Sequence, residues 1–294
     1  MAIIIDGKAI GAKVREEVRL RVEEVKKKGI TPCLAVVLVG DDPASHSYVR
    51  AKKKALAEAG MDGRDIRLPA TVSEEELISI VSSLNAEKNV HGILVQLPLP
   101  PHIREELVIA SIHPSRDVDC FHSVSLGNLL RGQPGFLPCT PHGILVLLKS
   151  LNITLAGKNT VVIGRSNIVG KPLALLLARK EQNATVTICH TGTADLPSYT
   201  RRADVLIAAA GKAGLVTGDM IKEGAVIIDV GVNSVPAPEK GPEGKRLVGD
   251  VVFDEAVKVA GYITPVPGGV GPMTIAMLMH NVLQAAEDQA GKLS

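Results

Sequence analysis

Two side chains in the first half of the chain, Tyr48 and Lys52, have the types and spacing that proton-transfer chemistry uses. They lie four residues apart in a segment whose pattern predicts a helix, so they share one face of it. An amine and a phenol can each give or take a proton during catalysis. The spacing by itself is more typical of an exposed tyrosine and lysine on a charged helix, so it identifies a candidate pair and no activity.

A Tyr-x-x-x-Lys pair also occurs in short-chain dehydrogenases, where it follows the nucleotide-binding turn within a single domain. In this chain the pair comes more than a hundred residues before the candidate turn at Gly164. We therefore exclude that class of dehydrogenase.

Three further polar residues lie where a ligand could reach them. Gln96 follows the apolar run 90–95, just before a proline-rich break. Ligands of open α/β sheets bind beyond the carboxyl ends of strands, so this amide is a candidate for a binding crevice. A loop amide bonded to backbone fits the position equally well. Asp117 and Asp119 lie in an irregular loop, where either carboxylate could instead cap a turn.

The middle of the chain contains an apolar run, a glycine turn and a helix pattern. Small residues fall at Gly164, Ser166 and Gly170, with one residue more in the last gap than in the dinucleotide fingerprint G-x-G-x-x-G. Such a turn directs backbone N–H groups and a helix N-terminus at one point, which suits a phosphate. An ordinary glycine turn could look the same, but the strands predicted after it favour a nucleotide site.

The residues around this turn favour NADP over NAD. An NAD site has an acid at the end of its second strand, which binds the ribose hydroxyls. Here the second strand is followed by His190 and Thr191, and no acid appears before Asp195. Arg165, in the first turn, could contact a 2′-phosphate, although it could also be merely solvated.

Apolar runs and helix patterns alternate along the chain, which predicts an α/β fold built from βα units with parallel strands. The expected strands are 33–39, 66–68, 90–97, 160–163, 184–189, 204–209 and 225–230. The expected helices are 8–28, 43–59, 73–85, 102–112, 140–151, 170–181 and 273–288. Residues 114–140 lose periodicity. The stretch 233–246, rich in Pro, Gly and Lys, is expected to be a mobile excursion.

Composition excludes several classes of protein. Of the 294 residues 46% are hydrophobic but only 2% aromatic, so the core must be aliphatic, as is usual where parallel strands face helices. The net charge of +2 and the absence of a long basic run argue against nucleic acid. No apolar stretch has the length of a membrane span, and none resembles a signal peptide. The four cysteines form no C-x-x-C pair and the histidines no metal-ligand spacing, which indicates a cytoplasmic protein without a metal.

Several motifs, taken in order along nearly the whole chain, resemble the bifunctional methylenetetrahydrofolate dehydrogenase/cyclohydrolase family. The first is Tyr48-Val-Arg-Ala-Lys52 after Gly40-Asp-Asp-Pro-Ala-Ser45, and the next is Gly92-Ile-Leu-Val-Gln-Leu-Pro-Leu-Pro100. They are followed by Asp117-Val-Asp119, Pro138-Cys-Thr-Pro141, Gly164-Arg-Ser and Thr264-Pro-Val-Pro-Gly-Gly-Val-Gly-Pro-Met-Thr274. The second and the last of these motifs are long and specific.

The resemblance implies NADP-dependent oxidation of 5,10-methylenetetrahydrofolate to 5,10-methenyltetrahydrofolate, and hydrolysis of that product to 10-formyltetrahydrofolate. It implies tetrahydrofolate derivatives as partners, a homodimer, and a place in the one-carbon metabolism that serves purine and amino-acid biosynthesis. Lys52 would be the central catalytic residue and Gln96 its hydrogen-bond partner. Tyr48 would pack on the folate, and Asp119 would hold the pterin.

The resemblance also assigns binding residues in the second half of the chain. Pro267, Gly268 and Gly269 would contact the substrate, and Val232 would give a backbone contact to the cofactor. The other cofactor-binding residues would be Gly164, Arg165, Ser166, His190 and Thr191.

Two residues depart from the family pattern. Cys120 stands where relatives usually have glycine, and a side chain there could narrow the loop beside Asp119. Thr191 stands where some relatives have serine or arginine, which leaves the contact to the 2′-phosphate less certain.

We therefore expect two α/β domains around a deep cleft. Residues 1–140 and 273–294 would form the folate-binding catalytic domain, and residues 141–272 a Rossmann-like NADP-binding domain with a parallel sheet. The alternatives are a dehydrogenase of the same family that lacks the second activity, and a nucleotide-sensing protein without catalysis.

Overall fold

The computed structural model describes residues 1–237 and 244–291, and these form two compact units. The three-stranded unit consists of Ala12–Cys139 and the described chain from Ile275 onward. The six-stranded unit consists of Met1–Gly11 and Thr140–Thr274. Each contains its own parallel sheet, so the predicted α/β class is confirmed. The expected cleft remains a prediction.

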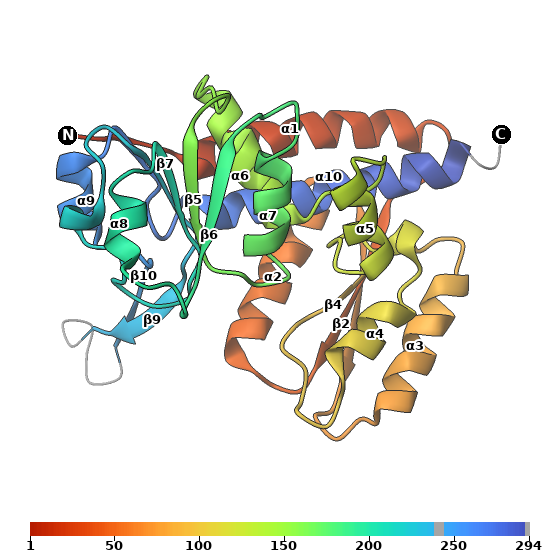
Figure 1. Cartoon of the computed structure of the whole chain (residues 1–294). Coiled ribbons are helices and arrows are strands. Elements are labelled where there is room, and N and C mark those ends of the chain that lie inside the picture. Colours follow the sequence, from red (N-terminus) through yellow and green to blue (C-terminus); the bar gives the residue numbers. More distant parts are fainter. Residues whose placement is uncertain (238–243, 292–294) are drawn as a thin grey trace. The chain divides into compact units, whose positions relative to one another are not determined.

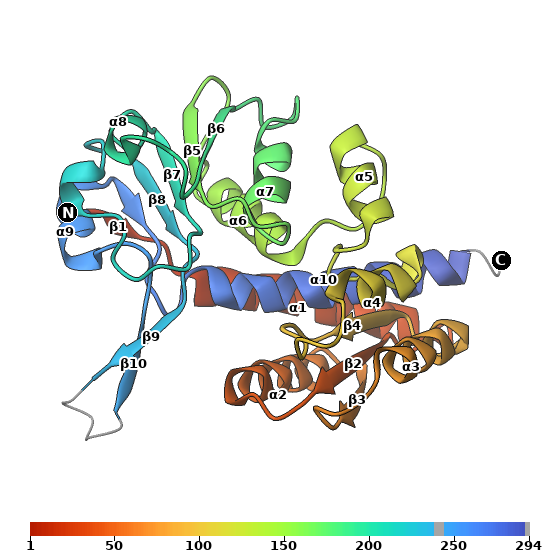
Figure 2. The same ribbon diagram turned by 60° about the horizontal axis from the view of Figure 1, so that its bottom comes forward.

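The sheet of the three-stranded unit has the order β3-β2-β4, and both pairings are parallel. Its strands are β2 (Cys33–Val39), β3 (Asp62–Leu68) and β4 (Gly92–Val95). Every residue of the central strand β2 and of β4 is buried, as expected for apolar strands without alternation. The helices that follow these strands in sequence are α2 (Pro43–Glu58), α3 (Glu74–Ala86) and α4 (Glu105–Ser111), all visible in Figure 2.

Two long helices, α1 (Gly7–Lys26) and α10 (Val270–Gly291), run side by side in Figures 1 and 2. An ion pair between Arg21 Nη2 and Glu287 Oε2, 2.6 Å long, joins them within the three-stranded unit. Val18, Val22 and Leu283 are buried, so the apolar faces of both helices are packed away from water.

The sheet of the six-stranded unit has the order β1-β11-β8-β7-β5-β6, with every pairing parallel. Its strands are β1 (Ile3–Ile4), β5 (Asn159–Ile163), β6 (Thr185–Cys189), β7 (Val205–Ala208), β8 (Val226–Asp229) and β11 (Tyr262–Ile263). The strand β5 lies between β6 and β7, so the direction of strand order reverses beside it. Ligands of open parallel sheets bind at such a reversal, outside the carboxyl ends of the strands.

The remaining elements of the six-stranded unit are short apart from one helix. They are α6 (Cys139–Ser150), α7 (Gly170–Leu177), α8 (Leu196–Thr200), α9 (Phe253–Val259) and the 3-10 turn Gly218–Met220. The first residue of α6, Cys139, belongs to the three-stranded unit. Figure 2 shows a hairpin, β9 (Asn233–Pro236) with β10 (Lys245–Val248), projecting from this unit.

The structure differs from the sequence-based expectation in several places. Residues 1–11 join the six-stranded unit instead of the folate-binding domain, because β1 pairs with β11. The loop 114–140 contains a 3-10 turn, Pro114–Arg116, and a helix, α5 (Ser123–Arg131). Strand β3 begins four residues before the predicted 66–68. The predicted excursion 233–246 forms the two strands of a hairpin; its part from 238 to 243 lies outside the described residues.

Both cores are aliphatic, as composition requires. In the three-stranded unit Val37, Leu77 and Ile93 belong to one fully packed cluster. In the six-stranded unit Leu206 and Ile227 belong to another. Among the described residues no helix has the combination of length and apolar character needed to cross a membrane.

Candidate functional site

Lys52 and Gln96 meet at the carboxyl edge of the three-stranded sheet. Lys52 Nζ donates a hydrogen bond to Gln96 Oε1 at 3.0 Å. Lys52 is on α2, which follows β2, and Gln96 comes directly after β4, the neighbour of β2. Gln96 N continues the ladder by donating to Val37 O, and Gln96 Nε2 donates to Leu97 O at 2.7 Å. The amide is therefore held in one orientation that presents its oxygen to Lys52.

Asp119 reaches the same edge from the next segment of chain. Asp117 pairs with Ile93 of β4 in a parallel bridge, and the turn that follows it carries Asp119. Burial raises the pKa of the nearby Cys139 thiol well above its usual range; the carboxylate of Asp119 raises it further and the ammonium of Lys52 opposes the shift. Lys52, Gln96, Asp119 and Cys139 thus form one cluster within this unit.

Asp117 is a structural carboxylate, the role that the sequence left open for either aspartate. It is buried, and its oxygens accept hydrogen bonds from Phe121 N, His122 N and Ser125 Oγ at 3.1, 2.9 and 2.6 Å. Burial raises the pKa of Asp117, and these hydrogen bonds oppose the shift. The carboxylate therefore fixes the start of α5 and the loop that carries Asp119.

Cys120 occupies a backbone position that favours glycine. Its φ is 61°, in the left-handed region that costs a side chain roughly 1 kcal/mol. The side chain is fully buried, and Sγ donates to Phe136 O at 3.2 Å. The thiol is thus anchored in the protein interior, and it ties the loop at Asp119 to the segment around Phe136.

Tyr48 lies one helical turn before Lys52 on α2, with 49% of its surface exposed. An exposed ring next to the cluster is available to pack on a planar ligand. The cluster of Lys52, Gln96 and Asp119 was expected from the family resemblance, whereas Cys139 was not assigned a place in it. Cys139 lies in the family motif Pro138-Cys-Thr-Pro141, which was the signal available in the sequence. All four cysteines are buried, so burial alone does not distinguish it.

The glycine turn of the six-stranded unit has the geometry of a close backbone approach. Gly164 follows β5 with φ of 123°, and a Cβ built there would lie 2.1 Å from Ala209 O. A Cβ on Gly170 would lie 2.2 Å from Gly164 O. Ser166 Oγ accepts from Val169 N and Gly170 N at 3.2 and 3.3 Å, which closes the turn at the start of α7. Only glycine fits at both positions, as a dinucleotide-binding turn requires.

The predicted contacts to a 2′-phosphate are exposed at this same edge. Arg165 lies in the turn, and Thr191 lies just beyond the end of β6; both are exposed. The ring of His190 accepts from Gly192 N through Nδ1 at 3.0 Å, so its other nitrogen, Nε2, carries the proton of the neutral ring. Val232, after β8, is 48% exposed. These residues surround the carboxyl edge where a nucleotide would bind.

Residues 264–269 of the motif form a tight loop against the start of α1, and residues 270–274 begin α10. A Cβ on Gly269 would lie 2.6 Å from Thr264 Cβ, and a Cβ on Gly7 would lie 1.8 Å from Gly269 O. Gly268 has φ of 114° and is buried, whereas Pro267 is exposed. The glycines therefore serve close packing within the six-stranded unit. The substrate contact expected of Pro267, Gly268 and Gly269 remains a prediction.

Comparison with known proteins identifies the family. The catalytic-domain profile of tetrahydrofolate dehydrogenase/cyclohydrolase matches residues 5–119, and the NAD(P)-binding-domain profile of the same name matches residues 138–290. This chain belongs to the tetrahydrofolate dehydrogenase/cyclohydrolase family.

Relatives in the tetrahydrofolate dehydrogenase/cyclohydrolase family match over nearly the full length. A bifunctional protein FolD from Geobacillus thermodenitrificans is 55% identical and one from Bacillus subtilis 53%, with at least 97% of each chain covered. The crystal structure of the bifunctional FolD of Campylobacter jejuni is 49% identical with a TM-score of 0.93, covering 98% of this chain and 99% of that one. A Trypanosoma brucei family member, solved with NADP and an inhibitor, is 42% identical with the same TM-score and 98% coverage of both chains.

Two buried carboxylates of the six-stranded unit have no counterpart in the sequence analysis. Asp229 ends β8, and Asp250 follows β10; they are 4% and 0% exposed. Burial raises the pKa of Asp229 to about 6, although backbone N–H groups of Asp250, Val251 and Gly231 oppose the shift and the charge of Asp250 adds to it. In the sequence, Asp250 is marked only by the glycine before it, and Asp229 only by its place at the end of an apolar strand.

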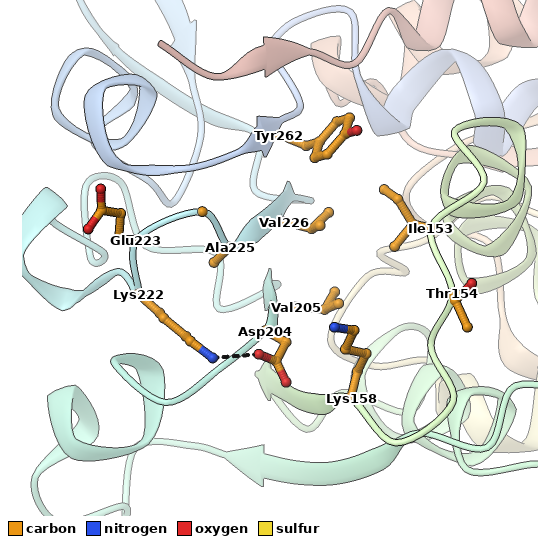
Figure 3. Close-up of a pocket in the computed structure, with 11 residues that line it drawn as sticks. Ile153, Thr154, Lys158, Asp204, Val205, Lys222, Glu223, Ala225, Val226 and Tyr262 are labelled. Atoms are coloured by element: carbon orange, nitrogen blue, oxygen red, sulfur yellow. Dashed lines mark hydrogen bonds and ion pairs between the residues drawn. The ribbon is translucent and has the colours of Figure 1, made fainter.

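A cavity of about 340 Å³ lies at the other edge of the same sheet, around the amino ends of β7 and β8 (Figure 3). Its ammonium groups, from Lys158 and Lys222, are matched by the carboxylates of Asp204 and Glu223, and Lys222 Nζ binds Asp204 Oδ1 at 2.6 Å. Because the cavity lies at the amino edge of the sheet, it is separate from the glycine turn at the carboxyl edge. The described residues contain no cluster of three or more His, Cys, Asp or Glu that could hold a metal.

Proposed function

We propose that this protein oxidises 5,10-methylenetetrahydrofolate with NADP and hydrolyses the resulting 5,10-methenyltetrahydrofolate to 10-formyltetrahydrofolate. The observation that carries the proposal is the Lys52–Gln96 hydrogen bond beside Asp119, at the carboxyl edge of a parallel sheet. Family membership with full-length bifunctional relatives supports both activities.

The glycine turn is the proposed site for NADP. The absence of side chains at Gly164 and Gly170 lets backbone amides approach a pyrophosphate, and Ser166 fixes the shape of the turn. NADP, when bound, supplies a nicotinamide ring that accepts a hydride from the one-carbon bridge. Arg165 and Thr191 would contact the 2′-phosphate, and His190 can donate from Nε2. The relative of Trypanosoma brucei, solved with NADP, supports this choice of cofactor.

The oxidation step requires little acid–base catalysis from the protein. The reacting carbon lies between two nitrogens, so the cation left after oxidation is delocalised and needs no strong base. Positioning carries this step. Asp119 would accept two hydrogen bonds from the aminopyrimidine edge of the pterin, and the exposed ring of Tyr48 would pack on the folate.

The hydrolysis needs a group that moves protons at the cationic carbon. Lys52 Nζ would exchange a proton with the attacking water, because it is the amine of the cluster. Gln96 Oε1 accepts one hydrogen bond from Lys52 Nζ. This bond restricts the rotamers of the lysine side chain, so that the rest of the amino group would face the substrate. We assign Gln96 the role of orienting Lys52.

The direct test is an assay of the full chain. The protein would be supplied with 5,10-methylenetetrahydrofolate and either NADP or NAD, and the absorbance of the methenyl product would be followed as it forms and decays. Formation with NADP and enzyme-dependent decay are expected. Formation without enzyme-dependent decay would indicate a dehydrogenase that lacks the second activity. If the protein neither forms the methenyl product nor speeds its decay, it would be a nucleotide-sensing protein.

We further propose that the protein works in the cytoplasm as a homodimer and serves one-carbon supply for purine and amino-acid biosynthesis. These proposals rest on the family resemblance. Analytical ultracentrifugation of the purified protein tests the homodimer, and sedimentation as a monomer would contradict it.

A further inference from the structure

Asp250 holds the loop that follows β7 in the six-stranded unit. One oxygen, Oδ2, accepts hydrogen bonds from Ala210 N at 2.7 Å and Gly211 N at 2.9 Å. The other, Oδ1, accepts from Asn233 Nδ2 at 2.9 Å. Asp250 is fully buried, so the carboxylate itself is shielded from water, and Asn233 Nδ2 also reaches Val248 O at 3.5 Å.

Asp229 in turn holds the backbone of Asp250. Its Oδ1 accepts from Asp250 N at 2.9 Å and from Gly231 N at 3.1 Å, and its Oδ2 accepts from Val251 N at 3.0 Å. The two carboxylates therefore join the ends of β7, β8 and β10 into one hydrogen-bonded network. A Cβ on Gly249 would lie 1.8 Å from Asp229 Oδ2, so the strands approach closely around it.

The loop held by Asp250 packs directly on the dinucleotide turn. Ala209 O lies 2.1 Å from where a Cβ on Gly164 would be, and Ala209 N donates to Ile163 O at 2.8 Å. Ala209 immediately precedes Ala210, whose N–H is bound by Asp250. Any shift of the β7 loop would therefore move the backbone of Ala209, which packs against Gly164.

We propose that Asp250, supported by Asp229, is a positioning residue for the dinucleotide: it holds the β7 loop against Gly164 and thereby sets the shape of the phosphate-binding turn. This inference rests on the proposed function, since it assumes that NADP binds at that turn. It assigns a binding role to a buried pair that touches no substrate.

An amide at position 250 cannot serve all three donors. Its single oxygen could accept from Ala210 N and Gly211 N, but its NH₂ group would then face Asn233 Nδ2, which is also a donor. Asn233 would have to reverse its own amide and lose the bond from Nδ2 to Val248 O. With the amide reversed, the two backbone N–H groups would lose their acceptor. A hydrogen bond to a charged group contributes about 1.5–3 kcal/mol, and where that free energy holds the β7 loop in its binding position, its loss lowers NADP affinity by roughly tenfold or more.

The experiment compares NADP binding and methenyltetrahydrofolate hydrolysis in the full chain. Isothermal titration calorimetry would give the dissociation constant of NADP for the wild type and for Asp250→Asn. We expect about a tenfold weaker affinity in the variant. Hydrolysis of methenyltetrahydrofolate, which uses no NADP, is expected to be unchanged. A thermal melt would report the loss of stability separately.

Two further variants separate positioning from general destabilisation. Asp204 accepts from Asn159 N at 2.9 Å and from Lys222 Nζ at 2.6 Å at the amino edge of the same sheet. Asp204→Asn leaves one oxygen for these two donors and should leave NADP affinity unchanged. Asn233→Ala removes one of the donors to Asp250 and should weaken NADP binding less than Asp250→Asn; it is the decisive variant if Asp250→Asn does not fold.

The outcomes are distinct. Wild-type affinity in both Asp250→Asn and Asn233→Ala, or equal weakening by Asp204→Asn, would overturn this inference and leave the proposed function intact. A wild type that binds no NADP would overturn the proposed function as well.

Discussion

Lys52 Nζ lies 3.0 Å from Gln96 Oε1, and this hydrogen bond joins two residues that are 44 positions apart in the chain. The pair exists because β2 and β4 are parallel neighbours, so that the helix after β2 and the residue after β4 begin at the same sheet edge. Gln96 is fixed by its own backbone and side-chain bonds to Val37 O and Leu97 O. The amine is thereby oriented by the end of a strand.

Gln96→Leu should impair catalysis through Lys52 and not through folding. The leucine keeps the volume but removes the oxygen that holds the amine, and misplacement of a catalytic group by about 1 Å can cost roughly a hundredfold in rate. We expect kcat for methenyltetrahydrofolate hydrolysis to fall by about that factor, with KM little changed. A matched control is Gln289→Leu, which removes the hydrogen bond that Gln289 Nε2 donates to His91 O in the same unit. Equal losses in the two variants would contradict an orienting role.

Asp119→Asn and Asp117→Asn should have different effects although the two residues are neighbours. The Asp119 variant should raise KM for the folate roughly tenfold or more, because one hydrogen bond to a charged group is lost. The Asp117 variant should instead lower the free energy of unfolding by about 1–3 kcal/mol, since its buried oxygens hold three donors. Urea denaturation and steady-state kinetics measure the two effects. A change of KM in neither variant would remove Asp119 from the folate site.

Arg165→Ala should weaken NADP more than NAD. A charge-assisted bond between the guanidinium and the 2′-phosphate is available to NADP alone, and its loss would reduce affinity by about tenfold or more. Lys180→Ala is a control, because this exposed lysine follows the other end of α7. Titration of each variant with both dinucleotides gives the comparison. Equal weakening of NADP and NAD by Arg165→Ala would contradict a contact with the 2′-phosphate.

Asp229 should make the protein less stable as pH rises from about 4 to 6. Its pKa is about 6 in the folded protein and 3.8 is its ordinary value, so the folded state holds a proton that the unfolded chain has released. The stabilisation is complete below pH 3.8 and is lost as pH rises through 6, by roughly 2–3 kcal/mol in total.

Urea denaturation at a series of pH values measures this effect. In Asp229→Asn the free energy of unfolding should be lower at acidic pH, but its decline between pH 4 and 6 should be smaller than in the wild type. Parallel pH curves for the two proteins would show that Asp229 titrates alike in the folded and unfolded chains.

The sequence predicted those features that repeat over several residues. The apolar strand β2, the apolar run in β5 and the helix patterns after them indicated the α/β class, and the glycine turn indicated where a dinucleotide would bind. The two-residue strands β1 and β11 could not be predicted, because Ile3–Ile4 is too short for a periodic pattern and is fixed only by pairing with Tyr262–Ile263. Strand β3 was mostly missed because it carries charged residues along a half-exposed edge.

The candidate site was predictable where family motifs exist and not where tertiary contacts decide. Lys52 and Gln96 belong to recognisable motifs, although their contact depends on the order of β2 and β4. Asp229 and Asp250 are 21 positions apart in the sequence, and nothing local indicates that the side chain of Asp229 binds the backbone of Asp250. The sequence showed that Cys120 stands where relatives usually have glycine. The structure adds that its backbone has a left-handed conformation, which favours glycine.

The most direct test of the account is the hydrolysis of 5,10-methenyltetrahydrofolate by Lys52→Met. The variant keeps an unbranched side chain of similar length but has no amine, and Lys54→Met, two residues away on the exposed side of α2, is its control. We predict a loss of hydrolysis of roughly a hundredfold or more in Lys52→Met, with unchanged NADP affinity, and wild-type rates in Lys54→Met. Wild-type hydrolysis by Lys52→Met would contradict the central role of this lysine.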